Sequence, residues 1–170
     1  MTDGKDIDRS EEWAAIKDRY LLPQRRRPAS AGGGVHHFAL LCSDVERTIA
    51  FYQGVLEFPL VELFENRDYR GSTHLFFDVG HDNYLAFFDF PGLDLGPYAE
   101  VLGGLHHLAI SVTPERWELL VAKLRQAGIE PHVVGGNSAY FAGPDGERLE
   151  LLALPLNDMY GTVVGGGEHR

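Results

Sequence analysis

Two pairs of adjacent histidines occur in nearly the same sequence context, 70 residues apart. Residues 34–40 read Gly-Val-His-His-Phe-Ala-Leu, and residues 104–110 read Gly-Leu-His-His-Leu-Ala-Ile. Neighbouring side chains on a strand point to opposite faces, so only one histidine of each pair can face a shared cavity. We take these to be His37 and its counterpart His107, whose imidazoles suit a borderline cation such as Fe(II), Mn, Co, Ni or Zn. The alternative is a pair of hydrogen-bonded core histidines, but their repetition at equivalent positions favours a metal site.

Glu150 is the third candidate ligand, and it lies between two leucines near the end of the second repeat. Residues 144–146, Pro-Asp-Gly, predict a tight turn, and the following strand places both leucines on one face and Glu150 on the other. If the leucines face the core, Glu150 lies with the histidines, where a bare carboxylate would be costly without a cation. We expect Glu147, beside the turn, to be solvated, whereas Ala86, at the matching position of the first repeat, cannot ligate a metal.

Two imidazoles and one carboxylate on one side of a cation leave up to three coordination positions open. Water, a substrate or dioxygen could take them, as in non-haem Fe(II) oxygenases. The three residues therefore predict a catalytic metal site.

The repeat also predicts the architecture that positions these residues. Each histidine-containing strand is followed by a predicted helix. The first helix begins at Asp44 and ends near Gly54, and the second is capped by Thr113, starts at Pro114 and ends at Gly128. Three strand-like runs follow each helix, at residues 60–64, 72–78 and 84–90 and at residues 129–134, 138–142 and 148–154. The sequence therefore predicts an α+β fold of two tandem βαβββ modules.

The two ends of the chain differ in composition from these modules. A polar start, a short helical stretch after Ser10 and the basic residues 25–27 precede a glycine run, and we interpret them as a helical arm and linker. The stretch from Gly161 has too little apolar surface to offset the entropy of ordering it. The predicted boundaries are 1–34 for the arm and linker, 35–154 for a single domain with modules 35–90 and 105–154, and 155–170 for a flexible tail.

Composition limits the range of partners. The chain has 170 residues and 44% hydrophobic content, enough for one core, and its formal net charge of -10 disfavours nucleic acid and anionic membranes. Cys42 is the single cysteine, the start is polar, and no apolar run approaches the ~20 residues of a membrane span. We expect a cytoplasmic protein that acts on a small molecule, and a homodimer is compatible with the sequence.

Three segments together resemble the vicinal oxygen chelate superfamily: residues 35–52, residues 104–110 and residues 139–151, the last reading Ala-Tyr-Phe-Ala-Gly-Pro-Asp-Gly-Glu-Arg-Leu-Glu-Leu. This superfamily includes glyoxalase I, methylmalonyl-CoA epimerase, fosfomycin-resistance thiol transferases, bleomycin-binding proteins and type I extradiol dioxygenases. The resemblance spans residues 35–154. It implies paired βαβββ modules whose mixed sheet curls around a metal cavity, with His37, His107 and Glu150 as ligands.

Departures from the family pattern favour some of its reactions over others. Glyoxalase I and the epimerase use a fourth ligand where this chain has Ala86, and bleomycin-binding relatives lack the metal ligands. The extradiol dioxygenase pattern is matched by the spacing of His132, Tyr140 and Glu150, although Gly143 replaces a polar residue. The position of the acid-base histidine in the extradiol pattern is occupied by Asn83 in this chain. His81, two residues earlier, would have to take its role. The alternatives are that Tyr140 only packs its strand and that His81 is an exposed loop residue.

The resulting hypothesis is an Fe(II) ring-cleaving dioxygenase acting on a catecholic or other vicinal-oxygen aromatic substrate with dioxygen. Tyr140, His132 and His81 are its candidate catalytic residues, and Phe76, Phe87 and Asn83 its candidate substrate-binding residues. One alternative is a glyoxalase-type lyase or isomerase, or a thiol transferase, using Mn, Ni, Co or Zn as a Lewis acid. A second is a protein that binds an aromatic ligand without catalysis.

Overall fold

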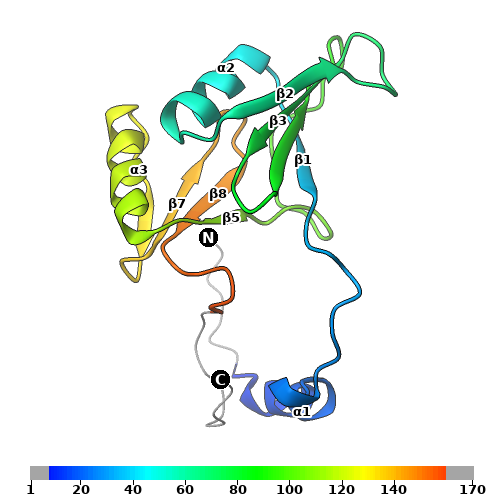
Figure 1. The fold of residues 1–170 in the computed structure, drawn as a ribbon, viewed down its shortest axis with the longest axis vertical. Helices are drawn as coiled ribbons and strands as arrows, with labels where there is room; N and C mark the ends of the chain where they lie inside the picture. Colours follow the sequence, from blue (N-terminus) through cyan, green and yellow to red (C-terminus); the bar gives the residue numbers. More distant parts are fainter. Residues whose placement is uncertain (1–7, 160–170) are drawn as a thin grey trace. The chain divides into compact units, whose positions relative to one another are not determined.

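The computed structural model describes residues 8–159, and the chain divides into two compact units (Figure 1). In the smaller unit the described residues form helix α1 (Ser10–Tyr20) and a short 3-10 turn, η1 (Gln24–Arg26). The helix predicted after Ser10 is confirmed. It has no buried residue, and the Arg9 guanidinium pairs with the Glu12 carboxylate at its start. No helix in the described part of the chain is long and apolar enough to cross a membrane.

The larger unit, residues 34–158, contains both repeats as βαβββ modules. In the first module, strand β1 pairs in parallel with β4, and the sheet order is β1-β4-β3-β2. The elements are β1 (His37–Leu41), α2 (Val45–Ile49), the π-helical turn η2 (Ala50–Val55), β2 (Leu60–Glu65), β3 (Thr73–Asp78) and β4 (Tyr84–Phe88). The Asp44 side chain accepts a hydrogen bond from the backbone N–H of Arg47, as expected of an N-cap.

The second module repeats this plan with sheet order β5-β8-β7-β6. Its elements are β5 (Leu108–Ser111), α3 (Pro114–Gln126), β6 (His132–Val134), β7 (Ser138–Ala142) and β8 (Arg148–Leu152). Helix α3 starts as predicted, because the Thr113 hydroxyl accepts from the Arg116 N–H and Pro114 takes the first position. Gly128 follows its end with a φ of +81°, a conformation that a residue with a side chain rarely adopts.

The first helical segment ends at Val55, close to the predicted end near Gly54, but it does not stay α-helical. Instead α2 widens into η2, which continues to Val55, and Glu57 takes the left-handed φ of 58° two residues later. Phe51 and Tyr52 are buried on this π-helical turn. The sequence therefore predicted the end of the segment to within one residue, but it did not predict the π-helical turn.

One hydrophobic core joins the two modules on the helix side of their sheets. Each sheet contributes alternate residues, which are fully buried: Leu75, Phe77, Leu85, Phe87, Leu149 and Leu151. Polar contacts also connect the modules, since Glu57 beside η2 pairs with both Arg116 and Lys123 of α3. Figure 1 shows α2 against the β2–β3 side and α3 beside β7 and β8. We call the opposite face of each sheet its open face.

Candidate metal centre

The open face of the second module holds two of the three predicted ligands next to each other. Glu150 is opposite Ala109 of β5 and Tyr140 of β7 in the strand register, on the face away from its flanking leucines. Its side chain is fully buried, and its Oε2 lies 3.2 Å from Nε2 of His107. The His107 and Tyr140 rings meet edge to face with centroids 5.7 Å apart. Three residues from three positions of the second repeat therefore form one cluster.

The geometry of His107 and Glu150 fits two ligands of one divalent cation. Metal–nitrogen and metal–oxygen bonds of about 2.1 Å place two adjacent ligand atoms about 3 Å apart, close to the 3.2 Å observed. A neutral imidazole and a carboxylate are also the donor types that Fe(II), Mn, Ni, Co and Zn accept. A buried carboxylate in such a position is stabilised by a cation.

His37 lies elsewhere, on the open face of the first module. It is opposite Tyr84 of β4 in the register, and its ring centroid is 5.5 Å from that of Phe76 and 6.4 Å from that of His74. Among residues 8–159, no three His, Cys, Asp or Glu side chains lie close enough together to hold one metal ion. A single chain therefore brings together His107 and Glu150 but not His37.

The two histidines of each pair do not point to opposite faces, which corrects the prediction. Nδ1 of His36 lies 2.8 Å from Nδ1 of His37, and Nδ1 of His106 lies 2.6 Å from Nδ1 of His107. The reason is that β1 begins at His37 and β5 only at Leu108. The preceding residues are outside the strands and do not follow the alternation of a pleated sheet.

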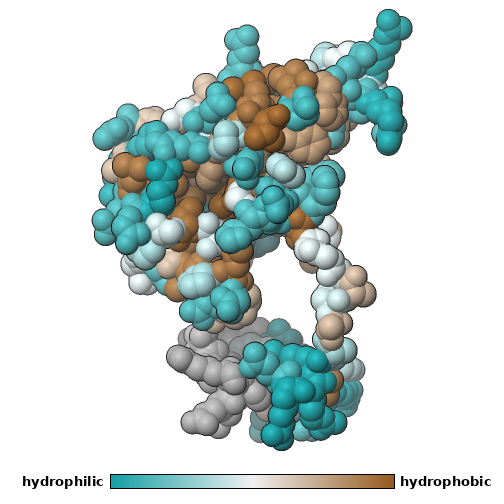
Figure 2. Space-filling view, viewed as in Figure 1, coloured by the Kyte–Doolittle hydropathy of each residue, from teal (hydrophilic) through white to brown (hydrophobic). Residues whose placement is uncertain are grey.

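The open face of the first module is an aromatic layer. The His74 ring stacks on Phe88 with centroids 3.9 Å apart and lies 4.2 Å from Phe76, which Phe64 approaches to 5.8 Å. Phe64 and Leu41 on this face are nearly half-exposed. Figure 2 shows apolar surface over β2 and β3. Phe76 thus lies beside His37, and its role in substrate binding stays a prediction.

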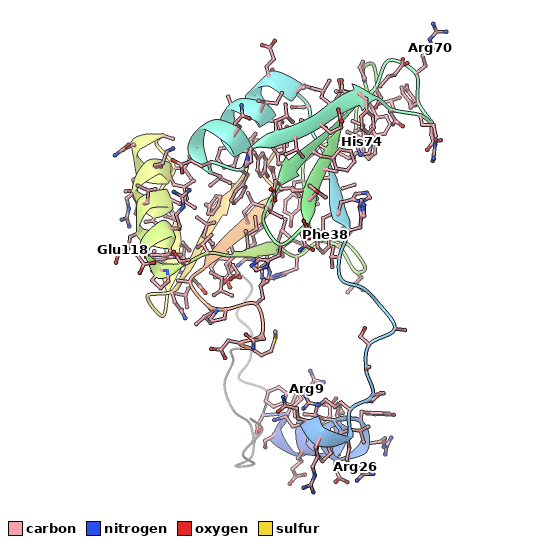
Figure 3. The ribbon with its side chains drawn as sticks, viewed as in Figure 1. Arg9, Arg26, Phe38, Arg70, His74 and Glu118 are labelled. Atoms are coloured by element: carbon pink, nitrogen blue, oxygen red, sulfur yellow. The ribbon has the colours of Figure 1, made fainter. Side chains whose placement is uncertain are left out.

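His74, labelled in Figure 3, is a residue that the sequence interpretation missed. Its Nε2 is buried and has no hydrogen-bond partner within the described residues. Burial lowers the pKa of this imidazole, and the nearby His37 lowers it further. A buried polar atom without a hydrogen-bond partner in its own chain is usually satisfied by a ligand, a water molecule or a partner chain. The signal was available, because His74 shares strand parity with Phe76.

Phe87 was expected to bind substrate, and the structure contradicts this. Its side chain is 1% exposed and packs against Tyr52, with ring centroids 4.8 Å apart, in the helix-side core. Phe76 and Phe87 belong to opposite faces of the same sheet, since Phe76 is opposite Ala86 in the register. Ala86 is also where the first module would need a carboxylate equivalent to Glu150.

Glu147 was expected to be solvated, and it is buried instead, with 6% of its surface exposed. The Tyr52 hydroxyl donates to its Oε1 at 2.6 Å, and the Asp145 backbone N–H donates to its Oε2. Burial raises the pKa of Glu147, and these hydrogen bonds partly oppose the rise. A β-carbon at Gly143 would lie 2.0 Å from Oε1 of Glu147, so a larger residue here would displace the Glu147 carboxylate from its hydrogen bonds. This contact explains the glycine that departs from the family pattern.

The remaining candidate residues divide between two places. His132 is opposite Tyr140 in the β6–β7 register, so it shares the open face of the second module. His81 and Asn83 lie in the turn between β3 and β4, where the Asn83 amide donates to the His81 carbonyl. Both line an apolar cavity of about 210 Å³ bordered by Phe38 and β5. Tyr140 and His132 are therefore near the ligand pair, and the Asn83 amide is used by its own turn.

Comparison with known proteins identifies the family. Residues 34–151 match the model of the glyoxalase/bleomycin resistance protein/dioxygenase superfamily. The chain belongs to this superfamily. The crystal structure of a glyoxalase family protein from Enterococcus faecalis superposes with a TM-score of 0.56 at 30% identity, covering 71% of this chain and 97% of that one. The superfamily assignment and the paired βαβββ fold inferred from the sequence are thus confirmed.

Two curated relatives have named activities of different kinds. The putative ring-cleaving dioxygenase MhqA of Bacillus subtilis is 26% identical over 77% of this chain and 43% of its own length. The metallothiol transferase FosB of Shouchella clausii is 26% identical over 69% of this chain and 78% of its own. Members of the superfamily include enzymes that act on small molecules, and equal identity to both relatives leaves the reaction to be decided by the site.

Proposed function

We propose that this protein is a metal-dependent enzyme whose cation is held by His107 and Glu150 of one copy and by His37 of a second copy. The observation that carries the proposal is the buried Glu150 carboxylate facing His107 Nε2 at 3.2 Å, while His37 lies on a separate open face. Two copies related by a twofold axis would form two such sites, because a symmetric interface pairs each surface with its counterpart twice.

The open faces support a second copy as the source of the third ligand. Leu41 and Phe64 are 48% and 45% exposed on the aromatic layer that contains His37. Exposed apolar surface of this kind, beside a histidine, is typical of an interface or a ligand site. If the aromatic layer of one copy packed on the second module's open face of the other copy, both faces would be covered. The aromatic side chains would then line one side of the metal site.

The reaction we propose is Fe(II)-dependent ring cleavage of a catecholic or other vicinal-oxygen aromatic substrate by dioxygen. Phe76 and Phe88 provide flat apolar surfaces for an aromatic ring, and the buried Nε2 of His74 is placed among them to bond one substrate oxygen. When bound, Fe(II) would supply coordination positions for two vicinal oxygens and would pass electrons to dioxygen.

The proton transfers are assigned to side chains on the second module's open face. The Tyr140 hydroxyl and the His132 imidazole would accept and return the substrate's hydroxyl protons. His81 is the alternative proton carrier, from the β3–β4 turn. Phe87 and Asn83 are no longer candidates for substrate binding. Phe87 is a core residue, and the side-chain amide of Asn83 donates a hydrogen bond within its own turn.

The second candidate function is Lewis-acid chemistry without oxygen, as a lyase, isomerase or thiol transferase using Mn, Ni, Co or Zn. The similarity to FosB favours this alternative as strongly as the similarity to MhqA favours the first. A third candidate, an aromatic-ligand binding protein, requires no metal for affinity. His107→Ala would then leave ligand affinity intact.

Anaerobic reconstitution with Fe(II), followed by oxygen uptake against a panel of catechols, tests the reaction. We expect one dioxygen consumed per ring cleaved, and we expect Tyr140→Phe to lower kcat by about 100-fold or more while metal affinity stays unchanged. His81→Ala and His132→Ala compared side by side identify the second proton carrier. No uptake above background at full Fe(II) occupancy would reject ring cleavage, and turnover without oxygen on Mn, Ni or Zn would select the Lewis-acid reaction.

A further inference from the structure

Four side chains form a continuous line from the surface to the buried Glu150, three from the second module and one, Glu100, from the segment just before it. The Glu100 carboxylate lies 3.8 Å from Nε2 of His106, whose Nδ1 is 2.6 Å from Nδ1 of His107. Nε2 of His107 then faces Glu150 at 3.2 Å. Each imidazole thus uses both ring nitrogens within the line. We propose that Glu100 and His106 are positioning residues that hold His107 in the one tautomer able to bind a metal, an inference that rests on the metal site of the proposed function.

Proton arithmetic gives the line only two arrangements when both imidazoles are neutral. A neutral imidazole has one N–H and one lone pair, and two facing Nδ1 atoms need one of each to form a hydrogen bond. In the first arrangement His107 donates from Nδ1, so its Nε2 lone pair is free for a cation, and His106 carries its proton on Nε2 toward Glu100. In the second arrangement every role is reversed: the His106 lone pair faces Glu100, and His107 directs an N–H at Glu150.

Glu100 favours the first arrangement, because an N–H directed at a carboxylate is stabilised and a lone pair directed at it is repelled. By the same rule Glu150, 3.2 Å from Nε2 of His107, favours the second arrangement in the metal-free protein, and a cation between Glu150 and His107 would remove that preference. The surroundings keep both residues in place. Arg148 donates from Nη1 to Glu100 at 3.3 Å, and the Tyr98 hydroxyl donates to the backbone carbonyls of Leu105 and His106. The surface carboxylate therefore biases His107 toward the form that a metal requires.

The first module contains the same histidine pair with a simpler environment. Nδ1 of His36 contacts Nδ1 of His37 at 2.8 Å, with rings arranged edge to face as in the second module. No ion pair between His36 and a carboxylate occurs in the described part of the chain. The histidine pair is therefore present in both modules, whereas the carboxylate beside it, Glu100, occurs among the described residues only next to the module that carries Glu150.

Metal affinity, measured as Co(II) competition against a chromophoric chelator with the full-length protein, tests the assignment. We expect His106→Ala to weaken Co(II) binding by about 10–100-fold, the usual effect of removing an outer-shell partner. His106→Asn should restore most of the affinity, because its Oδ1 can accept from His107 Nδ1–H. Glu100→Gln should have an intermediate effect. Glu118→Gln, on the outer surface of α3, makes the same change of charge as a control and should bind as the wild type.

Wild-type affinity for His106→Ala, or equal losses in the Ala and Asn variants, would overturn the assignment. Nitrogen-15 NMR of the histidine rings in the metal-free protein gives a second readout. The fraction of His107 protonated at Nδ1 should fall in Glu100→Gln, and an unchanged fraction would overturn the proposal. If the wild-type protein bound no metal, the proposed function would fail, while the NMR comparison would still decide the tautomer.

Discussion

The two modules share a backbone plan but differ in what their open faces carry. Strand order, the parallel pairing of the first and last strands and the capped helix are the same in both. The first face is an aromatic layer around His37 and His74, and Ala86 occupies the position that Glu150 occupies in the second. The second face is polar, with His107, Glu150 and Tyr140 in contact.

The two repeats share their core but differ in the side chains on their open faces. The core residues that define a βαβββ module are retained in both, so each sheet buries alternate leucine and phenylalanine side chains against a helix. The open faces differ, since the first is an aromatic layer and the second carries the polar cluster of His107, Glu150 and Tyr140. Neither face alone has three metal ligands among residues 8–159.

The largest effect should come from the residue in which the modules differ most. Glu150→Gln keeps the size of the side chain but removes its charge, so divalent metal binding should fall by more than about 100-fold, beyond the loss of an outer-shell contact. Isothermal titration calorimetry with Mn(II) or Co(II) measures this loss of metal affinity. Glu147→Gln makes the same change on the opposite side of the sheet and should retain the metal stoichiometry in its folded fraction. Equal losses in the two variants would contradict the assignment of faces.

The next comparison separates the two sides of the first module. Phe87→Ala should lower the free energy of unfolding by about 3–5 kcal/mol, because it opens a cavity beneath Tyr52. Phe76→Ala, on the open face, should cost clearly less stability but should weaken binding of an aromatic substrate. Urea denaturation and ligand titration of both variants give the result. A larger loss of stability in Phe76→Ala would show that the aromatic layer belongs to the core.

A smaller effect is expected where the two modules meet at Tyr52 and Glu147. Tyr52→Phe removes the hydroxyl that donates to Glu147, and an unmet buried acceptor costs about 1–3 kcal/mol. Since burial raises the pKa of Glu147 in the folded state, this group stabilises the fold most below its ordinary pKa of 4.5, and the contribution is lost as pH rises through the raised value. The Tyr52→Phe variant lacks a hydrogen bond that lowers the pKa of Glu147, so the loss of stability should extend to higher pH in the variant than in the wild type. Denaturation from pH 4 to 8 measures this, and parallel curves for the two proteins would show that the Tyr52 hydroxyl does not lower the pKa of Glu147.

Local signals in the sequence predicted most of the fold. Capping by Asp44 and Thr113, the proline at the start of α3 and the glycine after it are short-range features, and each is observed. The repeat predicted the modules because it is also visible in the chain itself. The end of the first helix was predicted to within one residue, but the π-helical turn on which Phe51 and Tyr52 are buried was not.

The candidate site was less predictable because it depends on contacts between the modules. Strand alternation placed Glu150 on the correct face, but it could not place Glu147, whose burial results from Tyr52 of the other module. Alternation also failed for His36 and His106, which precede their strands. Pseudo-symmetry suggested that His37 and His107 meet within one chain, whereas the modules share their helix-side core and leave the open faces apart.

A complementation experiment tests most directly whether two copies share each metal site. His37→Ala and Glu150→Ala variants are purified, shown to bind no metal alone, then mixed in equal amounts under conditions that exchange subunits. Shared sites predict that each mixed dimer regains one intact site, made of His37 from one chain and His107 and Glu150 from the other, so that the mixture binds about a quarter of the wild-type metal. If exchange is demonstrated and the mixture still binds no metal, the ligands do not come from two copies, and the account of the site is wrong.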